Sequence, residues 1–350
     1  MPALPPRSVT ALASGLLALF AVTACVPPPP PGGSATTTTV APATTAATPT
    51  TTAAPGGFRC PTWTATSANT ATDNRIQEAS GVAASRVNGA LWWIHNDGPN
   101  TAGQVVSPTL YGVDTTGATV STIDLNGATD IDWEDIDEVT IGGVSTIWVA
   151  DVGDNPKARP SVQLYRFVEP VVPAGQGVSV TPDVINLTYP GGAKHNVETT
   201  FVDPTNGDYY LVTKEVPPLV FRIPAASLVA GATIALSAPI ANLDALDHST
   251  NPAGKPTGGD LSNDGSLLAI KTLDRTFMWH RSPGQTIQAM LKARPAGDCI
   301  YDDVASVQQG MTPKLPDLGH GEAIGFTADG RQLATIAEGG RTPLRIFRTP

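Results

Sequence analysis

From residue 58 onward, the chain alternates short β-branched or aromatic runs with turns rich in Gly, Pro, Asn and Asp. Helical periodicity is nearly absent, and only residues 225–229 indicate a turn of helix. Short strands separated by turn signals are typical of an all-β fold. The length of this part favours internal repeats over a small sandwich.

Five repeats follow one another, each with an acidic residue on a short strand, a tight turn, and then a second and a third strand. The acidic starts are Glu78, Glu134, Glu198, Asp260 and Glu322. The turns are Asn88-Gly89, Gly142-Gly143, Asn206-Gly207, Asp264-Gly265 and Asp329-Gly330, which are hairpin signals. Fourth strands are readable near residues 119–124, 184–188, 233–236 and 286–291. The pattern predicts a five-bladed β-propeller; six blades, with one around residues 243–256 or 295–318, is the alternative.

The fifth repeat has no fourth strand of its own, because the chain ends. Propellers commonly close by borrowing a strand from the other terminus, which avoids an exposed sheet edge. We expect residues 60–66, which include Trp63, to fill that place. Cys60 and Cys299 are then a candidate disulfide that pins the closure in an oxidising compartment, with two unpaired buried cysteines as the alternative.

The N-terminal segment reads as a signal peptide over residues 1–24. One cation, Arg7, precedes an apolar run at residues 9–22, which is shorter than the roughly 18 residues of a spanning helix. The sequence Val22-Thr23-Ala24-Cys25 resembles the lipobox of bacterial lipoproteins. That resemblance implies that Cys25 is lipidated and anchors the protein to the cell membrane on its extracytoplasmic side. An uncleaved helix is the alternative.

A tether is expected to connect Cys25 with the propeller domain at residues 58–350. Residues 26–57 contain no charged residue and consist of Pro, Thr, Ala, Gly, Val and one Ser. Such a segment buries too little apolar surface to offset the entropy of ordering. Its Pro-rich pieces favour an extended spacer that holds the domain away from the membrane.

The charge of the domain limits its partners. Twenty Lys and Arg and 31 Asp and Glu lie beyond residue 58, so this part carries a net charge of 20 − 31 = −11. An acidic surface without a basic stripe repels nucleic acid and anionic headgroups. Cations, neutral sugars, peptides or another protein remain open as ligands, and we expect a monomer.

The repeat places acidic side chains around one channel mouth, because the first strand of a blade leaves the face to which the second strand returns. Converging carboxylates need protons, cationic side chains or a metal, and hard oxygen ligands suit Ca²⁺. We therefore expect a calcium site among Glu78, Glu134, Glu198, Asp260 and Glu322. In the alternative, each acid accepts backbone N–H bonds or pairs with a lysine and only fastens the ring.

Further polar residues are expected on this face. The ends of the second strands supply candidate ligand-binding residues, which are Asp97, Asp154, Asn155, Lys214 and Lys271. The loop histidines His95, His195, His248 and His320 are predicted to lie there too, and His95, His195 and His320 are the candidates for a general base.

Several segments resemble those of exported bacterial β-propellers grouped with phytase-like proteins. They are Glu78-Ala79-Ser80-Gly81, Asp132-Trp133-Glu134-Asp135-Ile136, Gly153-Asp154-Asn155, Gly258-Gly259-Asp260-Leu261-Ser262 and Gly321-Glu322-Ala323-Ile324. The resemblance implies acidic residues at the channel mouth that hold calcium and act on phosphoesters or lactones.

Two functions are compatible with these features. The chain lacks a G-x-S-x-G elbow, an H-E-x-x-H motif, a Walker loop and a cysteine zinc pattern. The absence of a complete catalytic motif favours a membrane-tethered module that binds an envelope or extracellular ligand. The alternative is a calcium-dependent hydrolase of small phosphoesters, esters or lactones, with ring acids as ligands and a loop histidine as base.

Overall fold

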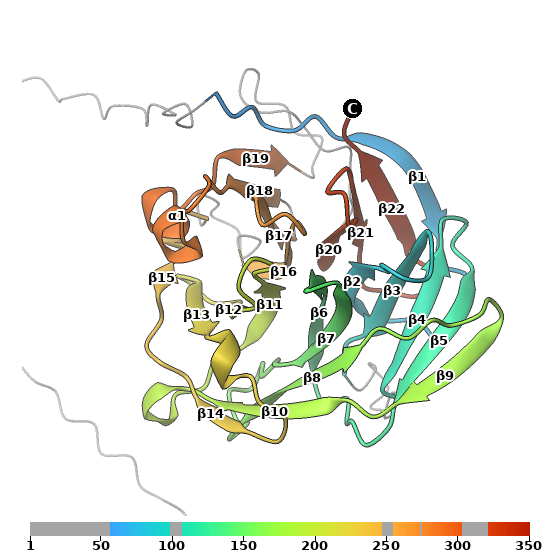
Figure 1. Ribbon diagram of the computed structural model, residues 1–350, viewed down its shortest axis with the longest axis horizontal. Coiled ribbons are helices and arrows are strands. Elements are labelled where there is room, and N and C mark those ends of the chain that lie inside the picture. Colours follow the sequence, from blue (N-terminus) through green and yellow to red (C-terminus); the bar gives the residue numbers. More distant parts are fainter. Residues whose placement is uncertain (1–56, 99–106, 247–254, 274, 303–320) are drawn as a thin grey trace, which may run out of the picture. The chain divides into compact units, whose positions relative to one another are not determined.

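Five separate sheets surround a central axis in the computed structural model, which describes residues 57–98, 107–246, 255–273, 275–302 and 321–350 (Figure 1). From blade 1 to blade 5, the innermost strands are β2 (Ala79–Ala84), β6 (Trp133–Ile141), β11 (Val197–Val202), β16 (Pro256–Leu261) and β20 (Ala323–Phe326). Each innermost strand contacts the next one, and β20 contacts β2. The prediction of a five-bladed β-propeller is confirmed, and the six-bladed alternative is wrong.

Three further strands complete each blade in antiparallel order. The second strands are β3 (Leu91–Asn96), β7 (Val144–Asp151), β12 (Tyr209–Thr213), β17 (Leu267–Thr272) and β21 (Gln332–Ile336). The third strands are β4 (Thr109–Asp114), β8 (Val162–Val168), β13 (Leu219–Ile223), β18 (Arg275–His280) and β22 (Pro343–Arg348). The fourth strands are β5 (Thr119–Leu125), β10 (Asp183–Thr188), β15 (Ala241–Asn242), β19 (Cys299–Asp302) and β1 (Thr64–Thr70).

Strand β1 closes the ring as predicted, although it begins four residues later than expected. It pairs antiparallel with β22, so that Thr64 lies opposite Arg348, and it becomes the outer strand of blade 5. A disulfide joins Cys60, just before β1, to Cys299 at the start of β19 in blade 4. The predicted disulfide is therefore confirmed, and it fastens the N-terminal strand to the neighbouring blade.

Two blades carry a fifth strand, which comes from the next blade along the chain. Strand β9 (Gln176–Val180) leaves blade 2 and pairs in parallel with β5 of blade 1. Strand β14 (Thr233–Ala235) leaves blade 3 and pairs in parallel with β10 of blade 2. The strand predicted at residues 233–236 exists, but its assignment to blade 3 was wrong. Strand propensity predicts that a segment is a strand but not which strand it pairs with. Here β9 and β14 pair with β5 and β10, which belong to the preceding blade.

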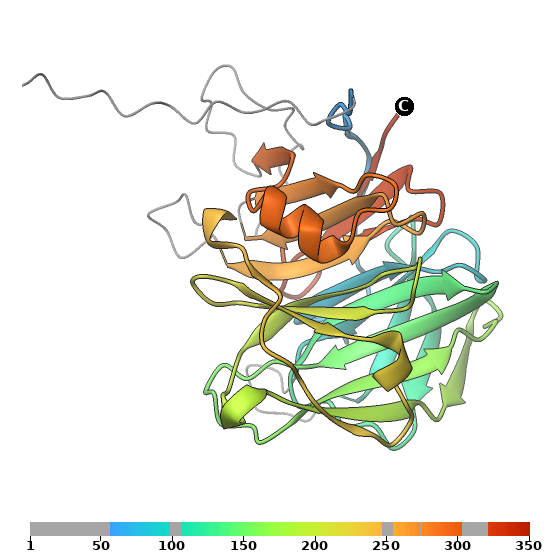
Figure 2. The same ribbon diagram turned by 60° about the vertical axis from the view of Figure 1, so that its left-hand side comes forward.

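The fourth strand predicted at residues 286–291 is instead helix α1 (Ile287–Ala293). The Thr286 side chain accepts a hydrogen bond from the backbone N–H of Ala289 at 3.1 Å, which caps the helix. Ile287, Met290 and Leu291 are buried at the i, i+3, i+4 spacing of one helix face. The helix lies at the outer edge of the ring, against β15 and β18 (Figures 1 and 2).

The remaining helical segments are single 3₁₀ turns, η1 (Pro190–Gly192), η2 (Ala225–Ser227) and η3 (Asp244–Leu246). The turn η2 confirms the one helical signal in the predicted domain. None of the helices in the described ranges combines the length and apolar character needed to cross a membrane.

The hydrophobic core lies between neighbouring blades. Each of five buried clusters draws its side chains from two adjacent blades, and one of them joins blade 5 to blade 1. Large aromatic residues contribute to these contacts; for example, Trp148 of blade 2 packs against Tyr209 of blade 3 with ring centroids 5.0 Å apart. Close packing of this kind makes the ring a rigid frame for the loops at its two ends.

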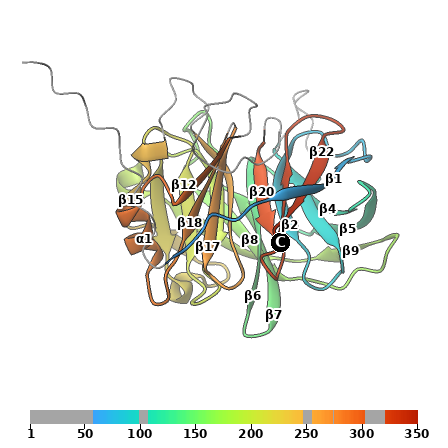
Figure 3. The same cartoon turned by 90° about the horizontal axis from the view of Figure 1, so that it is seen from above.

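The ring has two faces, which we call the mouth face and the hairpin face. The mouth face is where the first strands of the blades begin, for example at Trp133. The hairpin face is where the turns between first and second strands lie, for example at Gly142 and Gly143, and Figure 3 shows the ring from the side.

Candidate functional site at the channel mouth

The start of each innermost strand has an irregular residue that projects from the ladder. In four blades the pairing skips one residue, which is Ser80, Glu134, Glu198 or Thr257. In blade 5 the matching residue is Glu322, whose backbone N–H bonds to Ile336 while Ala323 also pairs with Ile336. A bulge redirects a side chain out of the regular sheet. The predicted acids coincide with this position in blades 2, 3 and 5.

The other two predicted metal ligands occupy different positions. Asp260 lies three residues after the bulge in blade 4, and its carboxylate accepts a hydrogen bond from the backbone N–H of Phe326 in blade 5 at 2.6 Å. Its burial raises its pKa to about 7. Glu78 lies two residues before the bulge in blade 1, where its carbonyl accepts a hydrogen bond from Asp97 N at 2.6 Å. Asp260 thus fastens neighbouring blades, as in the alternative interpretation of these acids.

Three carboxylates converge at the mouth between blades 1 and 2. Asp97 follows β3, Asp132 precedes β6, and Glu134 is the bulge residue of β6; one oxygen of each lies within 4.8 Å of the others. Asp97 was predicted as a ligand-binding residue and Glu134 as a metal ligand. Asp132 was missed, although it stands in the acidic segment Asp130-Ile131-Asp132. What marks Asp132 is its place two residues before the bulge, and the sequence alone does not show where the bulge lies.

Backbone contacts from the next loop hold Asp132 in place. Its N–H donates to Asp151 Oδ1 at 3.1 Å, and its carbonyl accepts from Gly153 N at 3.1 Å. Arg159 forms an ion pair with Asp151 at 2.7 Å and donates to the Gly153 carbonyl at 2.8 Å. One arginine outside the carboxylate cluster therefore orders the segment that packs against it.

Gly153 leaves the space that the carboxylates occupy. A Cβ atom at this position would stand 2.5 Å from Asp132 Oδ2 and closer still to Glu134 Oε1. Any larger residue would displace at least one of the two carboxylates. The glycine therefore serves the site through its small size.

The carboxylates are poorly neutralised. Burial, followed by repulsion from Glu198, Asp97 and Asp132, raises the pKa of Glu134 well above its usual value. Burial and the neighbouring Asp132 raise the pKa of Asp97 to about 8. Glu134 is 3% exposed, and its Oε1 atom has no hydrogen-bond partner. Protons or a cation must balance such a cluster, and three carboxylate oxygens form the donor set that Ca²⁺ or Mg²⁺ prefers.

A lysine occupies the other half of the mouth. Lys214 forms an ion pair with Glu198, whose carboxylate also accepts a hydrogen bond from Asn196 Nδ2 at 2.9 Å. Burial lowers the pKa of Lys214, but attraction to Glu198 and Glu322 outweighs it and the pKa is raised. Glu322 itself has its pKa raised to about 8, mainly by burial. Two predicted metal ligands thus lie near a lysine rather than in the carboxylate cluster.

The predicted ligand-binding residues Asp154, Asn155 and Lys271 make hydrogen bonds within the domain. Asp154 accepts hydrogen bonds from the backbone N–H groups of Ala158 at 2.7 Å and Arg159 at 2.9 Å. Asn155 accepts one from Asn196 at 3.1 Å. Lys271 is fully buried, and its Nζ donates to the Thr272 carbonyl at 3.2 Å. These predicted ligand-binding residues lie near the mouth but serve structural contacts.

Two of the candidate histidines are described. His95 is fully buried, its ring meets Trp133 edge-on, and burial lowers its pKa to about 4. His195 is more accessible, and its Nδ1 lies 2.9 Å from Glu215 Oε2. Lys157 pairs with the other oxygen of Glu215 at 2.6 Å. His248 and His320 lie outside the described residues.

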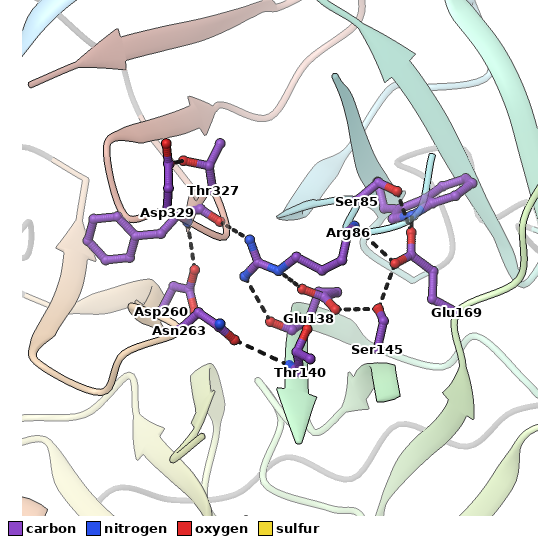
Figure 4. Close-up of polar contacts among 12 residues, drawn as sticks. Ser85, Arg86, Glu138, Thr140, Ser145, Glu169, Asp260, Asn263, Thr327 and Asp329 are labelled. Atoms are coloured by element: carbon purple, nitrogen blue, oxygen red, sulfur yellow. Dashed lines mark hydrogen bonds and ion pairs between the residues drawn. The ribbon is translucent and has the colours of Figure 1, made fainter. Parts of the chain in front are cut away.

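A second polar network lies at the hairpin end of the innermost strands (Figure 4). Arg86 of blade 1 forms an ion pair with Glu138 of blade 2 and donates to the Phe326 carbonyl of blade 5 at 3.3 Å. Glu169 accepts hydrogen bonds from Ser85 Oγ at 2.5 Å, Arg86 N at 3.0 Å and Ser145 Oγ at 2.7 Å. This network, which the sequence did not predict, connects blades 1, 2 and 5.

No protein-family model matches the chain, and no curated protein sequence matches it.

Proposed function

We propose that the chain is an exported lipoprotein whose propeller binds a ligand at its mouth face, with a Ca²⁺ ion held by Asp97, Asp132 and Glu134. One observation carries the metal proposal: the three carboxylates converge within 4.8 Å, while the buried Glu134 Oε1 has no hydrogen-bond partner. A calcium ion would supply the missing positive charge. Calcium takes six to eight oxygen ligands, so three carboxylates leave room for loop carbonyls, water or a bound ligand.

A binding module fits the rest of the mouth better than an enzyme does. Most of its polar side chains are engaged in fixed pairs, such as Lys214 with Glu198, which makes a rigid polar surface. The charge of this surface favours a cation, or a ligand that coordinates to one. Binding residues on loops of a rigid frame are a common arrangement.

Melting curves test the cation site. Calcium should raise the melting temperature of the full chain more than an equal ionic strength of sodium chloride does, because a ligand of the native state stabilises it. Glu134→Gln and Asp97→Asn should each remove most of this increment. Glu338→Gln, a change of an acid outside the cluster on the same face, should retain it. Equal melting temperatures in calcium and in chelator would refute the site.

The membrane anchor rests on the lipobox that ends at Cys25. Mass spectrometry of membrane-extracted protein should find an acylated N-terminal Cys25, and Cys25→Ala should release the protein or leave it unprocessed. An unmodified mature terminus elsewhere would contradict the anchor without bearing on the cation site.

A calcium-dependent hydrolase of small phosphoesters, esters or lactones is the second candidate. The contact between His195 Nδ1 and Glu215 favours it, because a carboxylate at one ring nitrogen orients the other as a base. If it is correct, wild-type protein should turn over one of these substrate classes in calcium, and His195→Gln should abolish turnover while calcium still raises the melting temperature. Absence of turnover by the wild type across the three classes favours the binding module.

A further inference from the structure

The exposed aliphatic residues are distributed unequally between the two faces. Large hydrophobic side chains are exposed at eight described positions, which are Val87, Ile131, Ile141, Val144, Val168, Val171, Val216 and Val229. Only Ile131, which precedes β6, and Val216, which follows β12, belong to the mouth face. The other six lie in turns between first and second strands or beyond the ends of β8 and β13, all on the hairpin face.

Three of these side chains form one patch on blade 2, which we call the tip patch: Ile141, Val144 and Val168. Ile141 and Val144 pair with each other across the glycine turn of the β6–β7 hairpin. Val168 ends the adjacent strand β8, where it pairs with Thr146. Figure 3 shows this hairpin extending beyond the other strands at its side of the ring. The patch is therefore both apolar and prominent.

A groove continues the apolar surface from the tip patch toward blade 3. It has a volume of about 430 Å³. Its lining combines apolar residues such as Ile141, Val168 and Leu228 with the ion pair of Arg166 and Asp183. Single exposed valines are ordinary on protein surfaces, but a prominent apolar cluster that borders a groove indicates a contact surface.

Three of the segments that form this surface carry no charged residue. Residues 139–150, 170–182 and 223–243 contain no Asp, Glu, Lys or Arg. Of the nearby charged groups, Arg166 pairs with Asp183 at 2.5 Å, and Glu138 and Glu169 are buried in the network around Arg86. The net negative charge of the domain therefore lies mostly outside this surface.

The first described residues of the chain lie on the same face. Phe58 stacks on His280 with ring centroids 4.2 Å apart. His280 ends β18 opposite Leu267, which directly follows the hairpin turn between β16 and β17. The described part of the chain therefore begins on the hairpin face, at residues 57 and 58.

We propose that the hairpin face of blade 2, with the tip patch foremost, rests on the lipid bilayer, so that the mouth points away from the membrane. This inference rests on the proposed anchor at Cys25, because a few aliphatic side chains bind a bilayer weakly by themselves. A tether changes that balance, since it converts the contact into an intramolecular event at high effective concentration. Neutral headgroups suit the surface, because the domain as a whole is acidic.

Amide hydrogen exchange of the full chain, in phosphatidylcholine nanodiscs and in detergent-free buffer, tests the orientation. The amides of residues 141–144 and of Val168, Glu169 and Val171 should exchange several-fold more slowly on the bilayer. The amides around Ile131 and Val216, on the mouth face, should exchange equally in both. The turn at Gly142 and Gly143 is exposed, so its amides exchange fast without a contact and give a wide range of measurement.

Matched variants separate the patch from general association. Ile141→Ser/Val144→Ser should lose the slowing, whereas Ile131→Ser/Val216→Ser should keep it; unchanged melting temperatures in buffer show that both fold. Exchange that is equal with and without the bilayer, or slowed at the mouth face, would overturn the proposal. Slowing that follows protein concentration without lipid would also overturn it, in favour of self-association. Calcium melting curves and the mass of the N-terminus are read separately, so failure of the cation site or the anchor is distinguishable.

Discussion

Gly153 packs directly against Glu134: a Cβ atom added to the glycine would collide with Glu134 Oε1, the buried oxygen that has no hydrogen-bond partner. The same Cβ atom would also collide with the side chain of Asp132. The relationship permits a test of the cation site that leaves all three carboxylates in place.

Gly153→Ala should weaken calcium binding while preserving the net charge of the mouth. Calorimetric titration should show a lower affinity, and the calcium-dependent stabilisation, about 2.7 kcal/mol at 100 times Kd for the wild type, should shrink at the same concentration. Gly340→Ala is the matched control, because a Cβ there meets nothing within 4 Å. An unchanged calcium affinity of Gly153→Ala would mean that the ion, if bound, does not use Asp132 and Glu134.

The sequence predicted the ring of blades far better than it predicted the site. Hairpin glycines such as Gly89 and Gly265 have the positive φ that the turn requires, so their chemistry marks each hairpin. The site instead depends on bulges, which shift the register by one residue without a distinctive side chain. For that reason Glu78 and Asp260 were aligned with Glu134, although Ser80 and Thr257 are its true equivalents.

The disulfide predicts a large effect on stability. Cys60→Ser/Cys299→Ser should lower the free energy of unfolding by about 2 to 5 kcal/mol, because the bridge restricts the unfolded chain and ties β1 to blade 4. Chemical unfolding measures the loss, and hydrogen exchange should become faster first at β1 and β22. The control variant Cys25→Ser, whose change precedes the propeller domain in the sequence, should unfold like the wild type. Loss of stability without faster exchange at β1 would show that the closure does not depend on the bridge.

Buried acids predict that the calcium-free domain loses stability as the pH rises. Asp260 has its pKa raised from 3.8 to about 7, and Glu322 has its pKa raised from 4.5 to about 8, in both cases mainly by burial. The folded state therefore holds protons that the unfolded state has released, so the free energy of unfolding falls between about pH 4 and pH 8.

Unfolding by urea in chelator at pH 5, 6, 7 and 8 measures this slope. Asp260→Asn should flatten the part between pH 4 and 7, because the amide oxygen can still accept from Phe326 N but no longer titrates. Asp329→Asn is the control, since the pKa of this exposed carboxyl is lowered, mainly by its hydrogen bond from Thr327. A stability that rises steadily from pH 5 to pH 8 would contradict the prediction.

The ion pair between Arg86 and Glu138 predicts a strongly non-additive double-mutant cycle. Both side chains are nearly inaccessible, at 6% and 1% exposure. Arg86→Met should cost about 3 to 5 kcal/mol in the free energy of unfolding, because it leaves a buried carboxylate without its cation. The double variant Arg86→Met/Glu138→Gln removes both charges of the pair, so its cost should be smaller than the sum of the two single changes. Arg331→Met, at an exposed position on the same face, should change stability by less than about 0.5 kcal/mol.

Burial raises the pKa of Glu138 to about 7 even though Arg86 opposes it, so the cost of Arg86→Met should grow from pH 6 to pH 8. Additive costs, or a cost of Arg86→Met that does not change with pH, would show that Arg86 acts through packing rather than through its charge.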